Sequence, residues 1–276
     1  MTVPGAMSER GCAFCSGRPL TREHVWPDWV RRLVADAPAM PYRRRMEFES
    51  RTLEEQEFLL RPFALTVKAV CGVCNNGWMS RLEEAAKPLL MPGLHGRGKR
   101  LSPGGQQVLA TWAFKSALVF GLTHRWPRGV PDEHYDHLLQ HGRPPEQCVI
   151  WMGAYNGPEP AFVQLAGMAI SRPGERVTSQ SRPNVYVFTL TMGPILLQVF
   201  ASADAEAFDV TNAHYRDPRL RAIWPISETF DWTPDGGLVA GELQRYADAI
   251  YDELDRRYPT ELSRIHGDFS IWNPRS

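Results

Sequence analysis

Four cysteines stand in two pairs of identical spacing, Cys12-x2-Cys15 and Cys71-x2-Cys74. A tight turn that carries two thiolates is half of a tetrahedral zinc site, so two such turns supply four ligands. Four protein ligands leave no open coordination position, which predicts a structural zinc rather than a catalytic one. The alternatives are four small buried side chains or a redox pair, and the matched spacing of the two turns favours zinc.

Residues that could do acid–base chemistry and bind a cation lie beside these turns. Glu23 and His24 follow the first turn, and Asn75 comes directly after Cys74. A neutral imidazole titrates near working pH and can accept a proton from water, while oxygen ligands suit Mg2+. The non-functional alternatives are a half-buried, hydrogen-bonded histidine, a solvated carboxylate and an asparagine that caps the next helix.

The first cysteine turn, the Glu-His pair, the second cysteine turn and Asn75 follow one another along the chain. In this order of motifs, the residues from Cys12 to about Leu90 resemble the HNH endonucleases, also called ββα-metal or His-Me finger enzymes. The likeness is to the zinc-stapled members, such as the phage Holliday-junction resolvases of the endonuclease VII type. It implies a DNA endonuclease with His24 as general base and with Glu23 and Asn75 as ligands of a catalytic Mg2+ or Mn2+. It also implies products with 5′-phosphate and 3′-hydroxyl ends.

A rival hypothesis is a zinc-stabilised nucleic-acid-binding module without catalysis. The family usually has Asp where this chain has Glu23, and it commonly has a middle Asn, whereas no Asn occurs between Glu23 and Cys74. On this hypothesis the catalytic cation site is lost and zinc alone is bound. A nuclease that acts on RNA is a third possibility.

The elements that must position these residues follow from periodicity and from Gly and Pro. The pattern predicts a strand over 63–70 that enters the second zinc turn, then a helix from Gly77 to about Leu90. Pro88 marks the predicted last turn of that helix, and Glu83 and Lys87 are spaced as an ion pair within it. Between the zinc turns we expect an inserted helix at 27–37 and a polar hairpin at 46–60.

The remainder of the chain predicts a second unit. The stretch 95–105 is rich in Gly and basic residues and is typical of a linker. After it we expect a buried apolar helix at 105–122. An antiparallel meander is expected from four strands, at 149–155, 161–170, 185–192 and 195–201. An amphipathic helix is expected at 238–257. The predicted fold class is α+β. A zinc-bound ββα-metal HNH domain is expected at 1–95, and an α+β domain for recognition, regulation or oligomerisation at 105–276.

Two smaller patterns complete the candidate sites. His134, His137 and His141 share one face of a predicted helix, and we favour a polar helix surface over a second metal site there. Cys148 opens an apolar run and is predicted to be a core residue.

Charge and composition limit the class of protein. The 31 Lys and Arg balance the 31 Asp and Glu, but residues 1–105 hold 16 basic and 11 acidic residues and the remainder holds 15 and 20. Phosphate contacts or a solvated surface are the two interpretations of a basic set in the first part, namely Arg43, Arg44, Arg45, Arg97, Lys99 and Arg100. Apolar residues make up 43% of the chain, but no stretch is long enough to span a membrane and no signal peptide is evident. We expect a cytoplasmic protein that acts on DNA and has no membrane partner; the sequence is compatible with a homo-oligomer.

Overall fold

Two strands from distant parts of the sequence form the first sheet. The computed structural model describes residues 11–33, 39–48, 51–61, 63–123, 129–158, 160–170, 178, 181–212, 217–257, 262–265 and 270–271. In it, β1 (Leu20–His24) runs antiparallel to β4 (Thr66–Cys71), so that Leu20 lies opposite Cys71 and His24 opposite Thr66. The pairing shifts register between Thr21 and Glu23, which is typical of a β-bulge.

A long helical segment follows β4 at once. It comprises α2 (Gly72–Cys74), a π-helical turn η1 (Asn75–Met79) and α3 (Ser80–Leu94), with a kink at Gly77, whose ψ is −107°. The order strand, strand, helix is therefore as predicted. The predicted end at Pro88 is wrong, because α3 runs through Pro88 and Pro92 to Leu94. Each proline costs one backbone hydrogen bond, but the packing of Ala86, Leu90 and Gly93 in the core holds the helix together.

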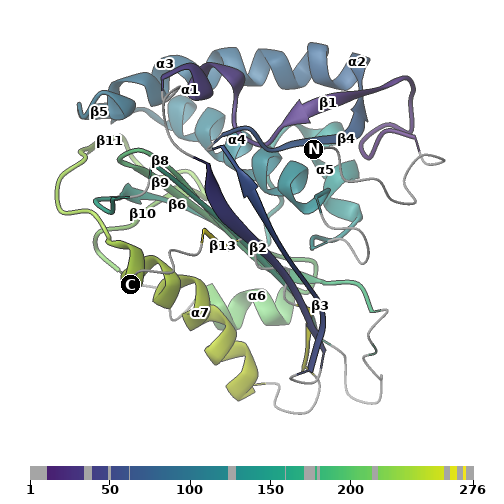
Figure 1. The fold of residues 1–276 in the computed structure, drawn as a ribbon. Helices are drawn as coiled ribbons and strands as arrows, with labels where there is room; N and C mark the ends of the chain where they lie inside the picture. Colours follow the sequence, from purple (N-terminus) through teal and green to yellow (C-terminus); the bar gives the residue numbers. More distant parts are fainter. Residues whose placement is uncertain are drawn as a thin grey trace.

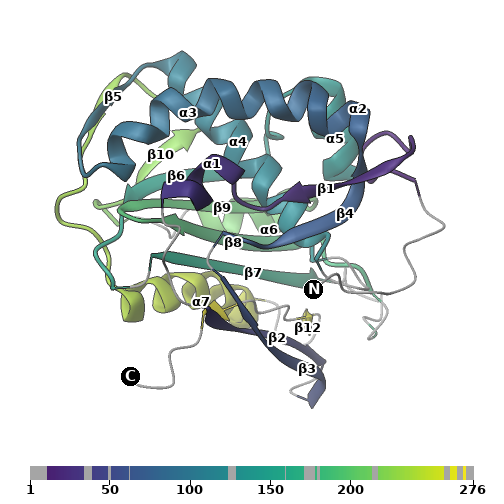
Figure 2. The ribbon, with the colours of Figure 1, turned by 45° about the horizontal axis from the view of Figure 1, so that its top comes forward.

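An insertion separates β1 from β4. It begins with α1 (Asp28–Leu33), where the predicted helix ends early; residues 34–37 of that prediction lie outside the described residues. The predicted polar hairpin is confirmed and is longer than expected: β2 (Met40–Phe48) pairs with β3 (Arg51–Leu60), and β13 (Ser270–Ile271) adds a third strand beside β2. In Figures 1 and 2 the hairpin extends away from α3 and α4 toward the lower right.

The segment predicted as a linker has regular structure instead. Within it, β5 (Lys99–Leu101) pairs with β11 (Phe230–Trp232) from the far end of the chain, and Leu101 is buried. Ser102 then caps α4 (Pro103–Gly121), since its hydroxyl accepts a hydrogen bond of 3.2 Å from the Gly105 amide. The sequence pattern of a linker thus conceals a short strand, because β5 is anchored by its partner β11.

Helix α4 lies at the centre of the fold, as Figure 2 shows. One side of it contacts α3 and the other contacts β6, β9 and β10, so the side chains from Leu109 to Phe120 are all buried. This confirms the predicted buried helix. Among the described residues, no helix is long and apolar enough to cross a membrane.

The main sheet has six strands, all antiparallel, in the order β10-β6-β9-β8-β7-β12. The predicted meander is confirmed, and Gly193, with φ +51°, makes the turn between β8 and β9. Cys148 is buried in β6, as expected. The strands are β6 (Cys148–Ala154), β7 (Ala161–Ile170), β8 (Val185–Met192), β9 (Ile195–Ser202), β10 (Arg221–Trp224) and β12 (Leu262–Ile265).

Helices cover both faces of this sheet. The short helix α5 (Glu133–His141) lies beside α4, while α6 (Ala205–Asn212) and α7 (Ala240–Arg257) lie on the other face (Figures 1 and 2). The α+β fold class is thus confirmed. Buried residues from Cys12 to Leu254 form one core cluster that crosses the predicted boundary. The division into 1–95 and 105–276 stays a prediction.

Candidate metal centre

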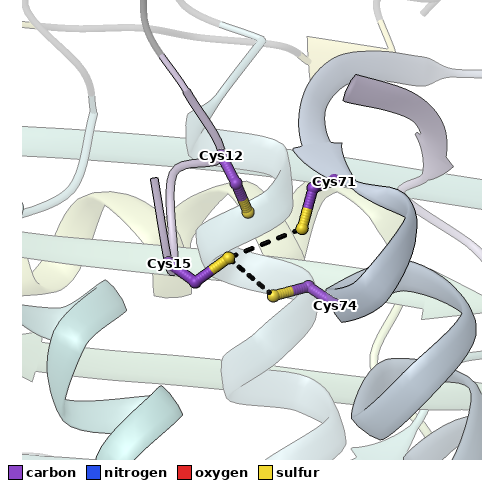
Figure 3. A group of neighbouring side chains, drawn as sticks. All are labelled: Cys12, Cys15, Cys71 and Cys74. Atoms are coloured by element: carbon purple, nitrogen blue, oxygen red, sulfur yellow. Dashed lines mark hydrogen bonds between the residues drawn. The ribbon is translucent and has the colours of Figure 1, made fainter. Parts of the chain in front are cut away.

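The four cysteines of the two zinc turns meet at one point of the structure. Cys12 and Cys15 come from a turn before β1, in which the Ser16 amide donates to the Cys12 carbonyl at 2.8 Å. Cys71 ends β4 and Cys74 ends α2. Because Leu20 lies opposite Cys71, the pairing of β1 with β4 carries the first turn to the second (Figure 3).

The spacing of the sulfur atoms fits a tetrahedral zinc ion. All four Sγ atoms lie within 4.8 Å of one another, and Cys15 Sγ is 3.5 Å from both Cys71 Sγ and Cys74 Sγ. A Zn–S distance of about 2.3 Å in a tetrahedron places sulfurs roughly 3.8 Å apart, so zinc requires only small movements. Three of the cysteines are buried and Cys15 is exposed. The cluster can therefore hold a structural zinc ion, as predicted.

Backbone groups next to the cluster favour thiolates. Burial alone raises the pKa of the Cys71 thiol, but the Cys74 amide and the neighbouring thiols outweigh it and lower that pKa to about 7. Burial also raises the pKa of Cys15, against a backbone hydrogen bond from Gly17 that lowers it. A Cβ added at Gly17 would lie 3.2 Å from Cys15 Sγ, so the sulfur would have to shift slightly. Burial also raises the pKa of the Cys74 thiol, so the surroundings favour a thiolate most clearly at Cys71.

Asn75 ties the second zinc turn to β1. Its Nδ2 donates two hydrogen bonds of 3.0 Å, one to Thr21 Oγ1 and one to the Arg22 carbonyl. The predicted helix-cap role is not seen, because Asn75 lies inside the helical segment that starts at Gly72. Asn75 instead braces the strand that carries Glu23 and His24.

His24 ends β1 and is partly exposed. Its neighbour across the sheet is Thr66, so Lys68, two residues further along β4, projects from the same face. Lys68 is exposed, and so is Arg22 on β1. A histidine with two exposed cationic side chains on the sheet of β1 and β4 is chemically suited to binding a phosphate.

Glu23 faces inward instead. Its side chain is 5% exposed, and its Oε1 accepts a hydrogen bond of 3.1 Å from Nζ of Lys115, which is fully buried in α4. The same Nζ donates to Glu83 Oε1 at 2.8 Å. The predicted pair of Glu83 with Lys87 is therefore replaced, and Lys87 lies 5.8 Å from the centre of the Trp29 ring.

Burial and charge act against each other in this cluster. Burial raises the pKa of the Glu23 carboxyl more strongly than the Lys115 ammonium lowers it. For Lys115, burial lowers the pKa, but Glu23 and Glu83 together outweigh it and raise it. Lys115 therefore stays protonated, and the cluster of one ammonium and two carboxyl groups depends on its own internal pairing.

A Mg2+ or Mn2+ ion on Glu23 and Asn75 does not fit this arrangement. The Glu23 carboxylate is directed at Lys115, while Asn75 is held against β1 through its Nδ2. Within the described ranges, the four cysteines form the one group of three or more His, Cys, Asp and Glu side chains that converge on a metal position. Asn75, from η1, thus braces the strand that ends at His24, but the Glu23 side chain of the same strand is engaged by Lys115.

The predicted phosphate-binding residues lie in two places. Arg43, Arg44 and Arg45 belong to β2, where they stand opposite Glu57, Gln56 and Glu55 of β3. Arg97, Lys99 and Arg100 flank or form β5, and Arg100 lies 3.8 Å from Asp231. The two basic sets thus belong to different elements, and acidic residues stand opposite or beside members of each set; contact with phosphates stays a prediction.

The three histidines of α5 do not converge. His134 is buried, with Nδ1 3.3 Å from the Tyr186 hydroxyl, while the rings of His137 and His141 contact each other at a tilt of 43° with their centres 4.5 Å apart. The preference for a helix surface over a metal site is right for His141, which is exposed, and wrong for His134, which is a core residue.

The buried His134 predicts a loss of stability in acid. Burial, with a smaller contribution from His137, lowers its pKa from 6.5 to about 4. The unfolded chain takes up a proton as pH falls below 6.5 and the folded chain does not until about 4, so stability falls across that window. The loss is about 3 kcal/mol. Urea unfolding at a series of pH values should show it in the wild type and not in His134→Gln; equal pH profiles would contradict it.

Comparison with known proteins adds no assignment. A scan against protein-family models gives no match, and searches of curated proteins and of solved structures give none. The functional argument therefore depends on the residues themselves.

Proposed function

We propose that this chain is a zinc-stabilised endonuclease of the HNH type that hydrolyses DNA phosphodiester bonds, with His24 as the general base. The observation that carries the proposal is the Asn75 brace. Asn75, one residue after Cys74, donates hydrogen bonds of 3.0 Å to the Thr21 hydroxyl and the Arg22 carbonyl. Two residues after Arg22, β1 ends at His24. The zinc turns thereby fix the strand that presents the imidazole, as a positioned base requires.

The chemistry assigns a role to each accessible group. A neutral His24 would take the proton from an attacking water, which typically contributes 10²–10⁴-fold to a rate. Arg22 on β1 and Lys68 on β4 are exposed, and their positive charges would attract phosphate oxygens. The arginines of β2 and the basic residues around β5 would add weaker contacts further along the nucleic acid. Glu23 has no direct part in this scheme, since its carboxylate is bound to Lys115.

Nicking of supercoiled plasmid tests the proposal. We expect zinc-loaded wild type to nick DNA in Mg2+, in Mn2+ or without added divalent ions, and His24→Ala to be at least about 100-fold slower, because the base is lost. His141→Ala, which removes an exposed histidine on α5, is the matched control and should keep wild-type activity. Zinc content and thermal unfolding are compared for all three proteins, and an RNA substrate is run in parallel.

Two results would contradict the nuclease. One is equal nicking by wild type and His24→Ala, which would indicate a contaminant or another base. The other is the absence of nicking by folded wild type with every metal and both nucleic acids.

A second candidate is a zinc-stabilised nucleic-acid-binding module without catalysis. The pairing of Glu23 with a fully buried lysine favours it, because the carboxylate that the HNH pattern uses for its cation is engaged inside the protein. This module would bind DNA or RNA with an affinity that falls as the salt concentration rises, and it would cleave neither. The same preparations, tested for binding and for nicking, distinguish the two functions.

A further inference from the structure

The most unusual group outside the cysteine cluster is the set of Glu23 and Lys115, which are buried, and Glu83, which is partly exposed. It joins three elements, since Glu23 comes from β1, Glu83 from α3 and Lys115 from α4. The Lys115 Nζ lies between the two carboxylates, 3.1 Å from Glu23 Oε1 and 2.8 Å from Glu83 Oε1. Lysine is almost never fully buried without such partners.

We propose that the Lys115 ammonium is an internal substitute for a divalent cation, so that the chain fills its own cation site. Two carboxylates from different elements converge on one point, which is the arrangement that binds Mg2+ or Mn2+ in proteins. Here that point is taken by an ammonium group whose side chain is 0% exposed. An ammonium and a metal ion cannot share it, because their charges repel and both need the same oxygens.

The inference depends on the contacts of this ion cluster and not on the proposed nuclease activity. It makes one statement about the wild type, which is that no divalent cation binds in a manner that requires Glu23. It makes another about Lys115→Met, which keeps the length of the side chain and removes its charge. The variant leaves two carboxylates without a cation, and the Glu83 side chain, 22% exposed, gives an ion access.

Mn2+ is the probe, because it prefers oxygen ligands over the thioether that the substitution introduces. Full-length, zinc-loaded protein is titrated with Mn2+, and free Mn2+ is followed by its electron paramagnetic resonance signal. We expect wild type and Glu23→Gln to give the same weak binding. Lys115→Met should gain one Mn2+ per chain with at least tenfold tighter affinity, and adding Glu23→Gln to it should abolish the gain. Lys87→Met, which removes a lysine outside the cluster, should behave as wild type.

Either statement can fail independently. Mn2+ binding by wild type that Glu23→Gln removes would overturn the proposal, and this comparison does not require a folded Lys115→Met. A folded Lys115→Met that gains no Mn2+ would also overturn it. Absence of nicking would refute the nuclease and leave this result unaffected, so failures of the two proposals are distinguishable.

Discussion

Withdrawal of zinc is expected to unfold the cysteine turns together with β1, β4 and the start of the α2–η1–α3 segment. We expect one zinc ion per chain as isolated. Residues 11–19 have almost no regular structure, and beside Cys12 and Cys15 they are attached to the remainder by the buried Phe14 side chain and by a hydrogen bond from the Ala13 amide to the Ala69 carbonyl. Zinc contributes about 10–16 kcal/mol of apparent binding free energy in small zinc domains, which exceeds the stability of a typical domain. Circular dichroism and thermal unfolding with and without a strong chelator measure the effect.

Substitution at the cluster should reproduce the effect of the chelator. Cys74→Ser removes one ligand and should lose zinc and lower the melting temperature, whereas Cys148→Ala, at a cysteine buried in β6, should keep one zinc per chain. If the chelator removes the zinc and the protein still unfolds at the same temperature as the untreated protein, the zinc is not structural.

Lys115→Met should destabilise the folded protein by about 3–5 kcal/mol. Removing one member of a buried ion cluster leaves charge without a partner, and here two carboxyl groups lose their cation at once. Urea unfolding at neutral pH, with zinc present and no other divalent cation, measures the change in the free energy of unfolding.

Neutralising the whole cluster should restore most of that loss. In the triple variant Glu23→Gln, Glu83→Gln, Lys115→Met, no unpaired charge remains, and buried ion pairs replaced as a unit are often neutral in their effect on stability. A triple variant less stable than Lys115→Met would mean that the side chains act separately. A cost below about 1 kcal/mol for Lys115→Met would mean that the lysine is not buried as described.

The features that could be predicted from the sequence are those set by local patterns. Two cysteine turns of equal spacing predicted one four-cysteine cluster, and stretches rich in β-forming residues, with a turn at Met192-Gly193-Pro194, predicted the meander β6 to β9. Both depend on residue types and spacing within short segments. The stretch predicted as a linker was the opposite case, because its Gly and basic residues gave no sign of a short strand whose partner, β11, lies far along the chain.

The partners of Glu23 could not be predicted in this way. Glu23 and Lys115 are 92 positions apart, and only the packing of α4 against α3 and β1 brings them together. One signal was present: a lysine in the middle of an apolar helix needs a carboxylate when that helix is buried. The sequence does not say which of the 31 acidic residues supplies it.

The position of Lys115 also sets an order of events during synthesis of the chain. Both zinc turns can close as soon as Cys74 has left the ribosome, but the ammonium that satisfies Glu23 and Glu83 emerges 32 residues after Glu83. In the interval, β1 and α3 carry the carboxylates of Glu23 and Glu83, whose ammonium partner has not yet been made. A fragment that stops at residue 105 is arrested in this state permanently. Helix α4 therefore completes the unit of β1, β4 and α3 that precedes it, because Glu23 and Glu83 obtain their ammonium partner only when that helix is made.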